Sequence, residues 1–385
     1  MLVDFSLEIL GPHDLLGFRN MNIPNVADVV TIGDSQTYGN NVGIAENWPS
    51  QLERLLKVKR SVVYSMASGG WGAVQYLNMY THATFFRPRV IVIAFYSGND
   101  PDESVTLAYS VEHWAPLRPD PSLDLSDKPR YPGFPVPLTE QWRAHFKDGQ
   151  TITFTPSLRL VSNDTAHATV RAGYQIMEKV AQLIARSASE AGIHIVLTII
   201  PTKELVYAQR VHREGITASA DYKKLVELER ENINRLAQSF KLLPNAVYVD
   251  LVEPLQKAAF SYPGLYPSQT NGHPMENGYR LIASVLAPAI GKYVKEPPLG
   301  LVRVVPDDKS AYYFLVADGG LWRFATDKIA ASNGWKPANA RTVDARDIAV
   351  FPQFGMIDIG DPKRFGPQRV RQRYAAQKLT VTNNE

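Results

Sequence analysis

Cysteine is absent from this chain of 385 residues, and its absence excludes several kinds of chemistry. The chain cannot form a disulfide, use a thiolate nucleophile, or hold zinc or an iron–sulfur cluster through cysteine. The H-x-H and H-E-x-x-H spacings of common metal sites are missing too, so we expect no metal site. A chain without cysteine suits a reducing or an oxidising compartment, which leaves its location open.

Long hydrophobic runs and a strong excess of one charge are also lacking. No stretch reaches the roughly 18 consecutive apolar residues that mark a membrane-spanning helix.

The charges are nearly balanced, with 41 Lys and Arg residues against 38 Asp and Glu residues and a net charge of +3. This balance argues against the concentrated basic face of a nucleic-acid-binding protein. The only basic run, at 363–378, is interpreted as a solvated terminus. The first 18 residues contain acidic side chains and no basic segment, unlike a secretory signal peptide.

Short β-branched runs alternate with amphipathic helical patterns over the first 295 residues. The run RVIVIAFY (89–96) is apolar throughout, which is typical of a parallel strand covered on both faces. From residue 170 onward, apolar residues recur at spacings of four and three, as in a helix. Repeated β-α-β units with right-handed crossovers predict a doubly wound α/β sheet. We expect strands at 27–32, 61–66, 89–96, 193–200 and 246–251, and further helices at 46–57, 225–240 and 276–293.

Two segments depart from this alternation. Residues 101–165 are rich in proline and aromatic residues and show no helical periodicity, so we expect a lid or a small subdomain there. The sequence EPPLG at 296–300 marks a boundary, beyond which residues 301–365 resemble short strands around a turn at Asp318-Gly319-Gly320. The chain should therefore comprise a domain at 1–295 with a lid-like insertion, and a small β-rich C-terminal appendage with a basic tail at 296–385.

Gly33-Asp34-Ser35 directly follows the first expected strand. Open α/β sheets bind ligands at the carboxyl ends of their strands, where this serine would stand. Its hydroxyl becomes a nucleophile only if a base accepts its proton. Taken alone, the tripeptide fits a plain turn equally well, with Ser35 or Thr37 capping the next helix.

Three more polar clusters follow strands: Ser68 to Gly72, Ser97 to Asp100, and Asn271 to Pro274. Because parallel strands end at the same edge of a sheet, we expect all of them to converge there. Glycine allows backbone N–H groups to approach a ligand closely. With an Asn amide as a further donor, such groups form an oxyanion hole for acyl transfer.

These blocks, in this order and spacing, resemble those of the SGNH (GDSL-type) hydrolase superfamily over about residues 17–294. The resemblance implies that Ser35 is the nucleophile and His273 the general base. It implies an oxyanion hole made by the N–H groups of Ser35 and Gly70 and by Asn99. It further implies a flavodoxin-like three-layer α/β/α fold with a five-stranded parallel sheet. The expected reaction is ester hydrolysis or acyl transfer through an acyl-serine, without a metal or an organic cofactor.

One residue departs from the family pattern. An acidic residue normally stands two or three positions before the catalytic His, whereas this chain has Thr270 and Asn271. The Asn oxygen can accept from Nδ1–H, but its NH2 group would donate and enforce the wrong tautomer. In a Ser-His-Asp triad an Asp-to-Asn change lowers turnover by roughly 10⁴. A Ser-His dyad, another acid reaching His273, or an engineered inactive variant would each explain the difference. We hypothesise that Asn271 occupies the acid position and that turnover is slow.

The stretch IPTKELVY at 200–207 is similar to a P-x-K-x-x-x-Y segment of the alginate O-acetyltransferase-like branch, which modifies bacterial polysaccharides outside the cytoplasm. The similarity implies substrate contacts for Lys203 and Tyr207, although a loop lysine paired with Glu204 or solvent fits as well. Asp34, beside the expected nucleophile, is interpreted as a local hydrogen-bond anchor rather than a general acid. Asp34 and Trp71 are further candidates for substrate binding. An extracytoplasmic location is expected from this resemblance only.

The most specific expectation is a serine-dependent O-acyl esterase or acyltransferase, with acetyl as the expected acyl group, whose partner is an acylated carbohydrate or another ester. Aromatic residues suit the apolar faces of sugar rings. A lipase or thioesterase of the same fold is one alternative, although residues 101–150 contain few aliphatic side chains. A non-catalytic carbohydrate-binding or assembly protein is the other, because Asn271 replaces the acid. The sequence leaves the oligomeric state open.

Overall fold

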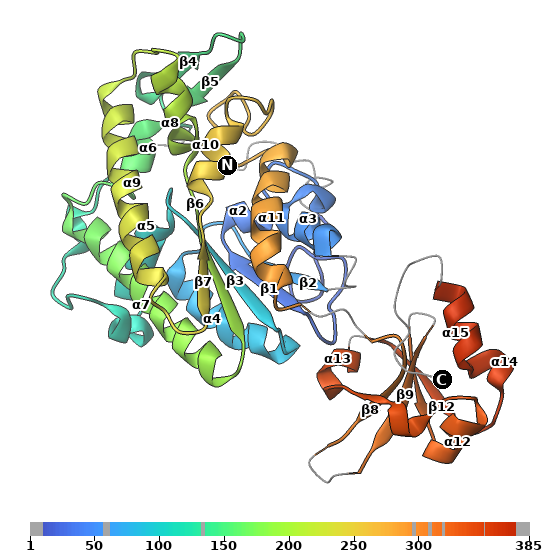
Figure 1. Cartoon of the computed structure of the whole chain (residues 1–385). Helices are drawn as coiled ribbons and strands as arrows, with labels where there is room; N and C mark the ends of the chain where they lie inside the picture. The colour runs from blue at the N-terminus through green and yellow to red at the C-terminus, as the bar shows by residue number, and fades with distance from the viewer. Residues whose placement is uncertain are drawn as a thin grey trace. The chain divides into compact units, whose positions relative to one another are not determined.

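The computed structural model describes residues 11–56, 62–131, 135–294, 298–306, 310–317, 320–349 and 351–374. They form two compact units (Figure 1), which are described separately. The larger unit holds most of the chain up to Val294, and the smaller one holds the residues from Lys295 onward. Among the described helices, none combines the length and the hydropathy that crossing a bilayer requires.

A five-stranded, wholly parallel sheet forms the centre of the larger unit, in the order β2-β1-β3-β6-β7. This confirms the predicted sheet, and the order is that of flavodoxin-like folds. Every residue of β1 and β3 is buried, as their continuous apolar sequences predicted. The strands are β1 (Val29–Gly33), β2 (Val63–Ala67), β3 (Val90–Tyr96), β6 (His194–Ile200) and β7 (Ala246–Val249).

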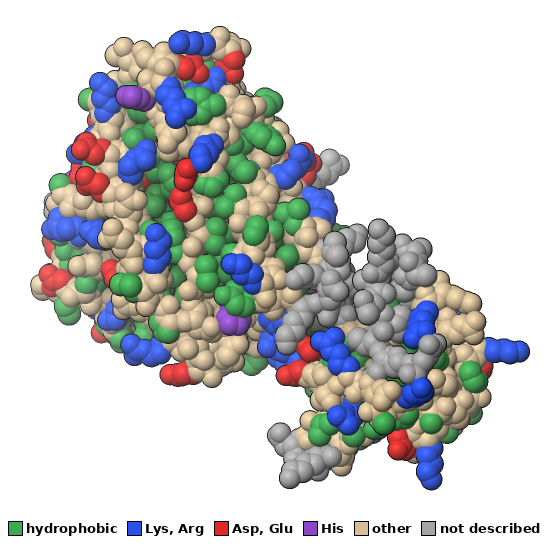
Figure 2. All heavy atoms as spheres, in the orientation of Figure 1, with side chains coloured by type: hydrophobic (Ala, Val, Ile, Leu, Met, Phe, Trp, Pro, Cys, Tyr) green, Lys and Arg blue, Asp and Glu red, His purple; other side chains and the backbone are tan. Residues whose placement is uncertain are grey.

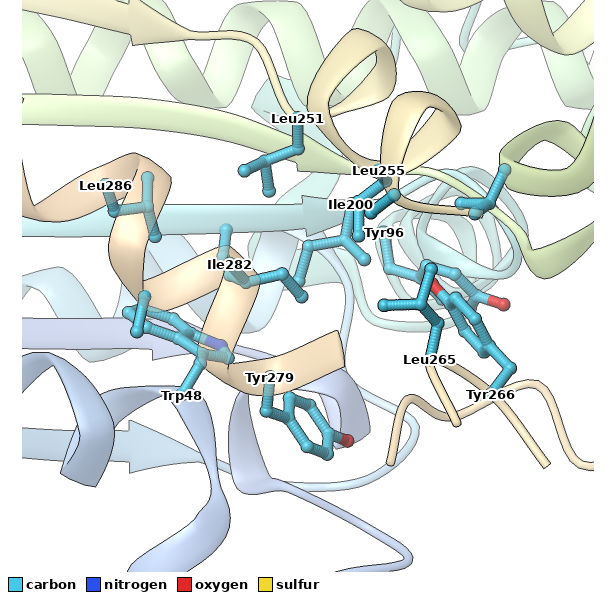
Figure 3. Close-up of a cluster of buried hydrophobic side chains, with 14 of the residues drawn as sticks. Trp48, Tyr96, Ile200, Leu251, Leu255, Leu265, Tyr266, Tyr279, Ile282 and Leu286 are labelled. Carbon is cyan, nitrogen blue, oxygen red and sulfur yellow. The ribbon is translucent and has the colours of Figure 1, made fainter. Parts of the chain in front are cut away.

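Helices cover both faces of this sheet, which gives the expected three layers (Figure 1). On one face α3 (Trp48–Leu56) packs against α11 (Glu276–Gly291). On the other, α7 (Ala168–Glu190) packs against α4 (Ala73–Ala83) and α9 (Ala220–Phe240). In Figure 3, Tyr279, Ile282 and Leu286 of α11 lie in one apolar cluster with Trp48, Leu251 and Leu255. Each buried Leu or Ile contributes about 1.5–3 kcal/mol through removal from water.

Helix α5 (Asp100–Ser110) begins the segment at 101–165, although the sequence of that segment shows no helical periodicity. It packs against α7, with Asp100, Asp102 and Ser104 among its buried residues. Because these polar residues share the buried face with Pro101, Val105 and Ala108, the sequence shows no continuous apolar stripe. Acidic residues in its first turn favour the helix through its dipole. The segment continues with 3-10 helices (Glu112–Leu117, Leu125–Asp127, Leu138–Glu140), the β4–β5 hairpin (Trp142–His145, Thr151–Phe154) and α6 (Pro156–Leu160).

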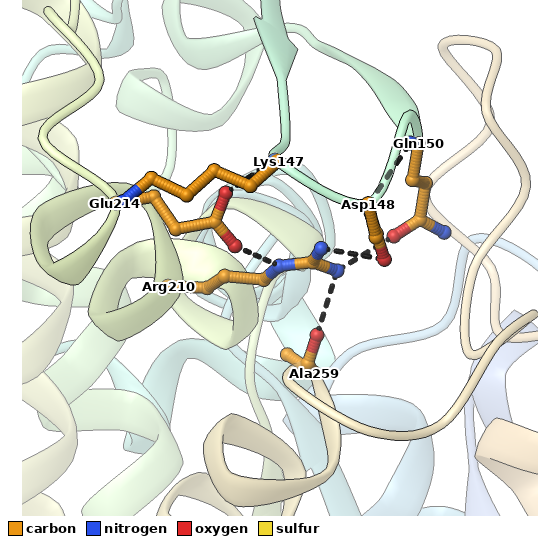
Figure 4. Close-up of polar contacts among 6 residues, drawn as sticks. All are labelled: Lys147, Asp148, Gln150, Arg210, Glu214 and Ala259. Carbon is orange, nitrogen blue, oxygen red and sulfur yellow. Dashed lines mark hydrogen bonds and ion pairs between the residues drawn. The ribbon is translucent and has the colours of Figure 1, made fainter.

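The β4–β5 hairpin is fixed to α8 (Lys203–Arg213) by Arg210 (Figure 4). The guanidinium pairs with Asp148 in the hairpin turn at 2.7 Å and with Glu214 at 2.7 Å. It also donates to the carbonyl of Ala259 at 3.0 Å, beyond the end of α10 (Val252–Ala258). The backbone N–H of Lys147 donates to Glu214, which completes a network that holds the hairpin turn on the helix.

The edge strand β7 is only half-buried, and a hollow of about 320 Å³ lies beside it. Hydrophobic side chains gather over the middle of the larger unit on the face drawn in Figure 2, with charged ones around them. The hollow includes Leu205, Ile233 and Tyr248 in its lining. The described residues that line it include no Ser, Thr or His, and therefore no hydroxyl nucleophile with a histidine base.

The smaller unit contains a separate mixed sheet in the order β11-β8-β9-β10-β12, which confirms the predicted β-rich appendage. Asp318 and Gly319 of the predicted turn lie outside the described residues. The strands are β8 (Gly300–Val304), β9 (Tyr312–Ala317), β10 (Gly320–Phe324), β11 (Arg341–Thr342) and β12 (Gln353–Ile357), and the helices are α12 (Asp327–Ser332), α13 (Ala345–Ala349), α14 (Pro362–Phe365) and α15 (Pro367–Tyr374).

The basic run is not simply a solvated terminus over its described part, which contains most of α14 and all of α15. Phe365 and Val370 are buried in the apolar cluster of this unit. Trp335 Nε1 donates to the carbonyl of Phe365 at 2.7 Å, which ties the segment to the sheet. The sequence did not predict this packing, because Phe365 and Val370 are the only two apolar side chains of the described run that lie in the core. Residues 375–378 lie outside the described part.

Glu229 of α9 links the segments that follow β3 and β6. Its carboxyl group accepts from Ser97 Oγ at 2.5 Å, and from Thr202 N–H at 2.8 Å and Thr202 Oγ1 at 2.6 Å. The side chain is fully buried, and desolvation raises its pKa to about 7. Because protonation relieves this desolvation, the fold holds a proton on Glu229 at pH values where an exposed Glu is ionised.

We predict that Glu229→Gln flattens the pH dependence of stability. The Glu229 contribution is fully present below the unfolded-state pKa of 4.5 and is lost as the pH rises through about 7. Between these values the wild type should lose about 1.4 kcal/mol per pH unit relative to the variant. Urea unfolding at pH 5 and pH 8 measures this difference. Glu231→Gln, at an exposed position of the same helix, is the control, and parallel curves for wild type and Glu229→Gln would contradict the prediction.

Candidate active site

Ser35 is the first residue of α2 (Ser35–Tyr38), directly after β1. Asp34 caps this helix by accepting from the N–H of Gln36 at 2.9 Å, so neither Ser35 nor Thr37 is the cap. A Cβ on Gly33 would lie 2.1 Å from Thr37 Oγ1, and the tight turn therefore requires glycine. The strand-to-helix turn thus places the Ser35 hydroxyl at the carboxyl edge of the sheet.

Asp34 is fully buried directly behind Ser35, and its Oδ2 lies 3.3 Å from Ser35 Oγ. Burial raises the pKa of Asp34 to about 7. Its carboxyl group accepts from the N–H of Gln36 and lies against Ser35. The structure therefore gives Asp34 an anchoring contact, and Asp34 is not among the residues that line the cavity described below.

His273 joins Ser35 and Asn271 in one hydrogen-bonded chain. Its Nε2 lies 2.8 Å from Ser35 Oγ, and its Nδ1 lies 2.8 Å from Asn271 Oδ1. Within the described part of the chain, these two side chains are its hydrogen-bond partners, and no carboxylate takes the place of Asn271. The sequence clusters that follow the first and last strands therefore meet, although they are separated by 238 positions.

The orientation of the Asn271 amide determines the tautomer of His273. Asn271 Oδ1 also accepts from the backbone N–H of His273 at 3.0 Å, a group that can only donate. The Asn271 Nδ2 donates to Asn41 Oδ1 at 3.5 Å, on the other side of the amide. Since the oxygen faces His273, Nδ1 must carry the proton and donate it to the amide. Nε2 is then left with its lone pair toward the Ser35 hydroxyl, as a base requires.

The pKa of His273 is lowered to about 3, first by desolvation of the ring and then by the positive charge of Arg159. At neutral pH the imidazole is therefore uncharged and able to accept a proton. The amide of Asn271 carries no charge that would stabilise the imidazolium. The site therefore holds His273 in the tautomer that a base requires. Protonating this imidazole costs free energy, because the ring is desolvated and no described carboxylate stabilises its positive charge.

A cavity of about 400 Å³ opens beside Ser35 and His273. Gly70 and Asn99 line it as well, so the residues expected to form an oxyanion hole lie at the same cavity as the serine and the histidine. Gly70 has a φ of +72°, a conformation that favours glycine. Asn99 precedes α5 but makes no capping hydrogen bond with its side chain. The other lining residues are Gln36, Tyr96, Glu103, Tyr131, Leu158 and Arg159.

Lys203 does not face this cavity, because it is buried in the first turn of α8 with 1% of its surface exposed. Its Nζ donates to the carbonyl oxygens of Gln269 at 2.5 Å, Asn271 at 3.1 Å and Pro267 at 3.4 Å. Desolvation lowers its pKa to about 8. The expectations of a substrate contact and of a solvated loop lysine are both replaced by a structural contact that holds the loop before His273.

Tyr207 and Trp71 also lie away from the cavity lining. Tyr207 is fully buried, with the rings of Phe146 and Phe154 at 5.7 and 5.9 Å between centroids. Trp71 packs edge-to-face on Phe18, 6.3 Å between centroids. Both side chains pack in the fold, so the structure brings neither to the place where they were expected to bind substrate.

Several lining residues carried no clear sequence signal. Glu103, Tyr131, Leu158 and Arg159 all come from the segment interpreted as a lid, but no local pattern marks them. Tyr96 could have been found, because it ends β3 directly before the Ser97 cluster. Among the described residues, no group of three His, Asp or Glu side chains is placed to hold a metal ion.

Comparison with known proteins gives only distant structural likenesses. No protein-family model and no curated protein sequence matches the chain. An acetylxylan esterase from Geobacillus stearothermophilus, solved as a catalytic mutant, aligns over 70% of this chain and 96% of its own at 10% identity and a TM-score of 0.39. An α/β hydrolase from the metagenome of Lake Arreo aligns over 69% and 96% at 14% identity and a TM-score of 0.37. A GDSL-like lipase from Bacteroides thetaiotaomicron aligns over 69% and 87% at 15% identity and a TM-score of 0.34. With TM-scores this low, the chemistry of the site follows from its own geometry and not from these proteins.

We predict that Lys203→Met lowers the free energy of unfolding by about 2–4 kcal/mol, because three carbonyl groups lose their buried donor. Methionine keeps the unbranched length but cannot donate. Lys224→Met is the matched control, since Lys224 is 52% exposed and its ion pair with Asp164 is worth about 1 kcal/mol or less. Guanidinium unfolding of the three proteins tests this, and equal midpoints for wild type and Lys203→Met would contradict it.

Proposed function

We propose that this protein is a serine-dependent O-acyl esterase or acyltransferase that acts on an acylated carbohydrate through an acyl-serine. The observation that carries the proposal is the hydrogen-bonded chain from Asn271 through His273 to Ser35 at the edge of a cavity. A hydroxyl, a base in hydrogen-bond contact with it and a group that orients the base are the parts of an activated nucleophile. The sequence resemblance to SGNH hydrolases supports the same roles.

In the proposed reaction His273 Nε2 removes the proton of Ser35 as Oγ attacks the acyl carbonyl. The N–H groups of Ser35 and Gly70 and the amide of Asn99 would stabilise the oxyanion, each by about 3 kcal/mol. The bond to the alcohol then breaks, and the alcohol leaves with the proton from the imidazolium. Water, in a hydrolase, or a second hydroxyl, in a transferase, releases the acyl group from Ser35 and returns a proton through His273.

A carbohydrate is the substrate class that best suits the lining of the cavity. The lining combines polar side chains with two tyrosine rings, Tyr96 and Tyr131, and Leu158 is its one aliphatic residue among those described. Sugar rings use both polar contacts and aromatic faces, whereas a lipid chain needs a broader aliphatic surface. The similarity of residues 200–207 to the O-acetyltransferase-like branch supports an acetyl group and a location outside the cytoplasm.

A non-catalytic carbohydrate-binding protein is the second candidate, and the specific observation in its favour is Asn271. The amide leaves the imidazolium without a counter-charge, so a protein with this site could bind an acylated sugar and turn it over very slowly. Both candidates use the same cavity. They differ in whether the Ser35 oxygen forms a covalent bond.

Labelling with a fluorophosphonate probe tests the proposed chemistry. We expect wild-type protein to be labelled and Ser35→Ala to be unlabelled, because the probe reacts with an activated serine. Ser284→Ala, at an exposed position of α11, is the control and should label as the wild type does. Absence of labelling in the wild type, together with binding of acetylated sugars, would overturn the catalytic proposal in favour of the binding protein.

We predict that Asn271→Asp raises turnover of 4-nitrophenyl acetate at pH 7 by about 10²–10⁴-fold, because a carboxylate stabilises the imidazolium that forms in the transition state. The same carboxylate raises the pKa of His273 from about 3, so activity should now fall as the pH drops through the new, higher value. Wild-type activity should instead persist to about pH 4.

The pH profile of kcat/KM between pH 4 and pH 8 measures both effects. Asn277→Asp, at a neighbouring position whose amide donates to the carbonyl of Pro263, is the matched control and should leave the rate and the profile unchanged. An Asn271→Asp variant that is folded but no faster than the wild type would contradict the assignment of Asn271 to the position of the acid.

A further inference from the structure

Arg159 brings a positive charge to the cavity, and no described carboxylate forms an ion pair with it. It lies on α6 and lines the cavity together with Ser35 and His273. Its Nε is buried and has no hydrogen-bond partner among the described residues. The charges of Glu204 and Glu229 act on the guanidinium without an ion-pair contact. Arg210, in contrast, is paired with two carboxylates. Since burying a charge without a partner is costly, an unpaired arginine in a cavity points to a ligand that completes it.

Tyr96 adds a second unused donor at the same place. Its side chain is 2% exposed and its hydroxyl has no hydrogen-bond partner among the described residues. The guanidinium of Arg159 lies 5.7 Å from the centre of the Tyr96 ring. A Cβ on Gly272 would lie 2.6 Å from Arg159 Nη2 and 3.5 Å from the Tyr96 hydroxyl oxygen. The two donors therefore converge beside the residue that precedes His273.

The chemistry of these donors selects the ligand. A guanidinium is always charged, only donates, and matches the two oxygens of a carboxylate or phosphate. A tyrosine hydroxyl can add a third hydrogen bond to the same oxygens. Glu103 is the acidic residue among the described lining residues. It lies against Gly72, in the loop after β2, whereas Arg159 lies against Gly272. Among the lining residues, the positive charge thus lies on the His273 side of the cavity.

We propose that Arg159 and Tyr96 form a subsite for a negatively charged group, a carboxylate or phosphate, carried by the ester substrate. The proposal rests on the proposed function and deepens it, because it states which esters the cavity selects. Pairing with the anion satisfies the guanidinium and the tyrosine hydroxyl together. It also offsets the positive charge beside His273, which lowers the pKa of the imidazole in the free protein. The bound anion thereby supplies a negative charge that Asn271 does not provide.

Two pairs of matched esters test the subsite and show which part of the substrate carries the charge. For the alcohol part, 4-acetoxybenzoate is compared with its neutral isostere 4-acetoxybenzamide. For the acyl part, monophenyl succinate is compared with phenyl succinamate. In the wild type we expect kcat/KM for the charged ester to exceed that for its isostere about 10–100-fold in one of the pairs, as for hydrogen bonds to a charged group.

Variants assign this preference to the two residues. Arg159→Gln should bring the ratio to about one, and Arg159→Lys should leave part of it, because lysine keeps the charge without the fork. Tyr96→Phe, which removes only an unpartnered hydroxyl, should lower the ratio while retaining the fold. Arg186→Gln, at an exposed position of α7, makes the same charge change and should leave the ratio as in the wild type. Equal rates within both pairs in the wild type, or a preference that persists in Arg159→Gln, would overturn the proposal.

Binding to the Ser35→Ala variant separates this proposal from the proposed reaction. Calorimetric titration with the same four compounds and with inorganic phosphate requires no turnover. Tighter binding of the charged compounds that is lost when Arg159→Gln is added supports the subsite, even if the wild type hydrolyses none of the esters. Equal or undetectable binding of charged and neutral compounds overturns the subsite, while hydrolysis of the neutral esters would leave the proposed function standing.

Discussion

The position of His273 depends on one buried ammonium group. Lys203 Nζ binds three backbone carbonyls in the loop from Pro267 to Asn271, and the loop has no regular secondary structure of its own. Because Lys203 stands in the first turn of α8, directly after β6, the loop is tied to the central sheet. The hydrogen bonds from His273 to Asn271 and Ser35 can form only while this loop keeps its shape. A lysine can perform this task since its three N–H groups point in different directions.

Charge is distributed unusually in the candidate site. The residue that orients His273 is a neutral amide, the carboxyl group behind Ser35 is buried with a raised pKa, and the Nε of Arg159 has no hydrogen-bond partner among the described residues. The cavity is therefore short of negative charge next to the base. The Asn271 amide preserves the tautomer of His273, so the geometry of the base survives without the charge of an acid. The chain therefore positions the base and fixes its tautomer. The anionic group proposed for the substrate would supply part of the negative charge that the site lacks.

Sequence patterns predicted the elements whose buried faces are apolar. The five strands of the larger unit and helices α3, α7, α9 and α11 follow from hydrophobic runs and from spacings of three and four. Helices α5 and α8 were missed because their buried residues include Asp100, Asp102, Lys203 and Glu204, which in a sequence resemble surface or loop residues. A buried polar face is stabilised by partners that are far away in the chain. Local periodicity contains no information about them.

The sequence by itself determined that Ser35, Gly70 and Asn99 would meet, because each directly follows a parallel strand and such strands end at one edge of the sheet. His273 lies beyond α10 and a loop, and it was expected there from the family resemblance. Only the tertiary structure decided which atom of Asn271 faces the imidazole, since a backbone N–H and the amide of Asn41 select it. It also decided that Lys203 supports a loop and that Arg159 reaches the cavity. These outcomes depend on which distant groups surround each side chain, and burial and pairing of polar atoms are properties of the folded chain rather than of any segment of it.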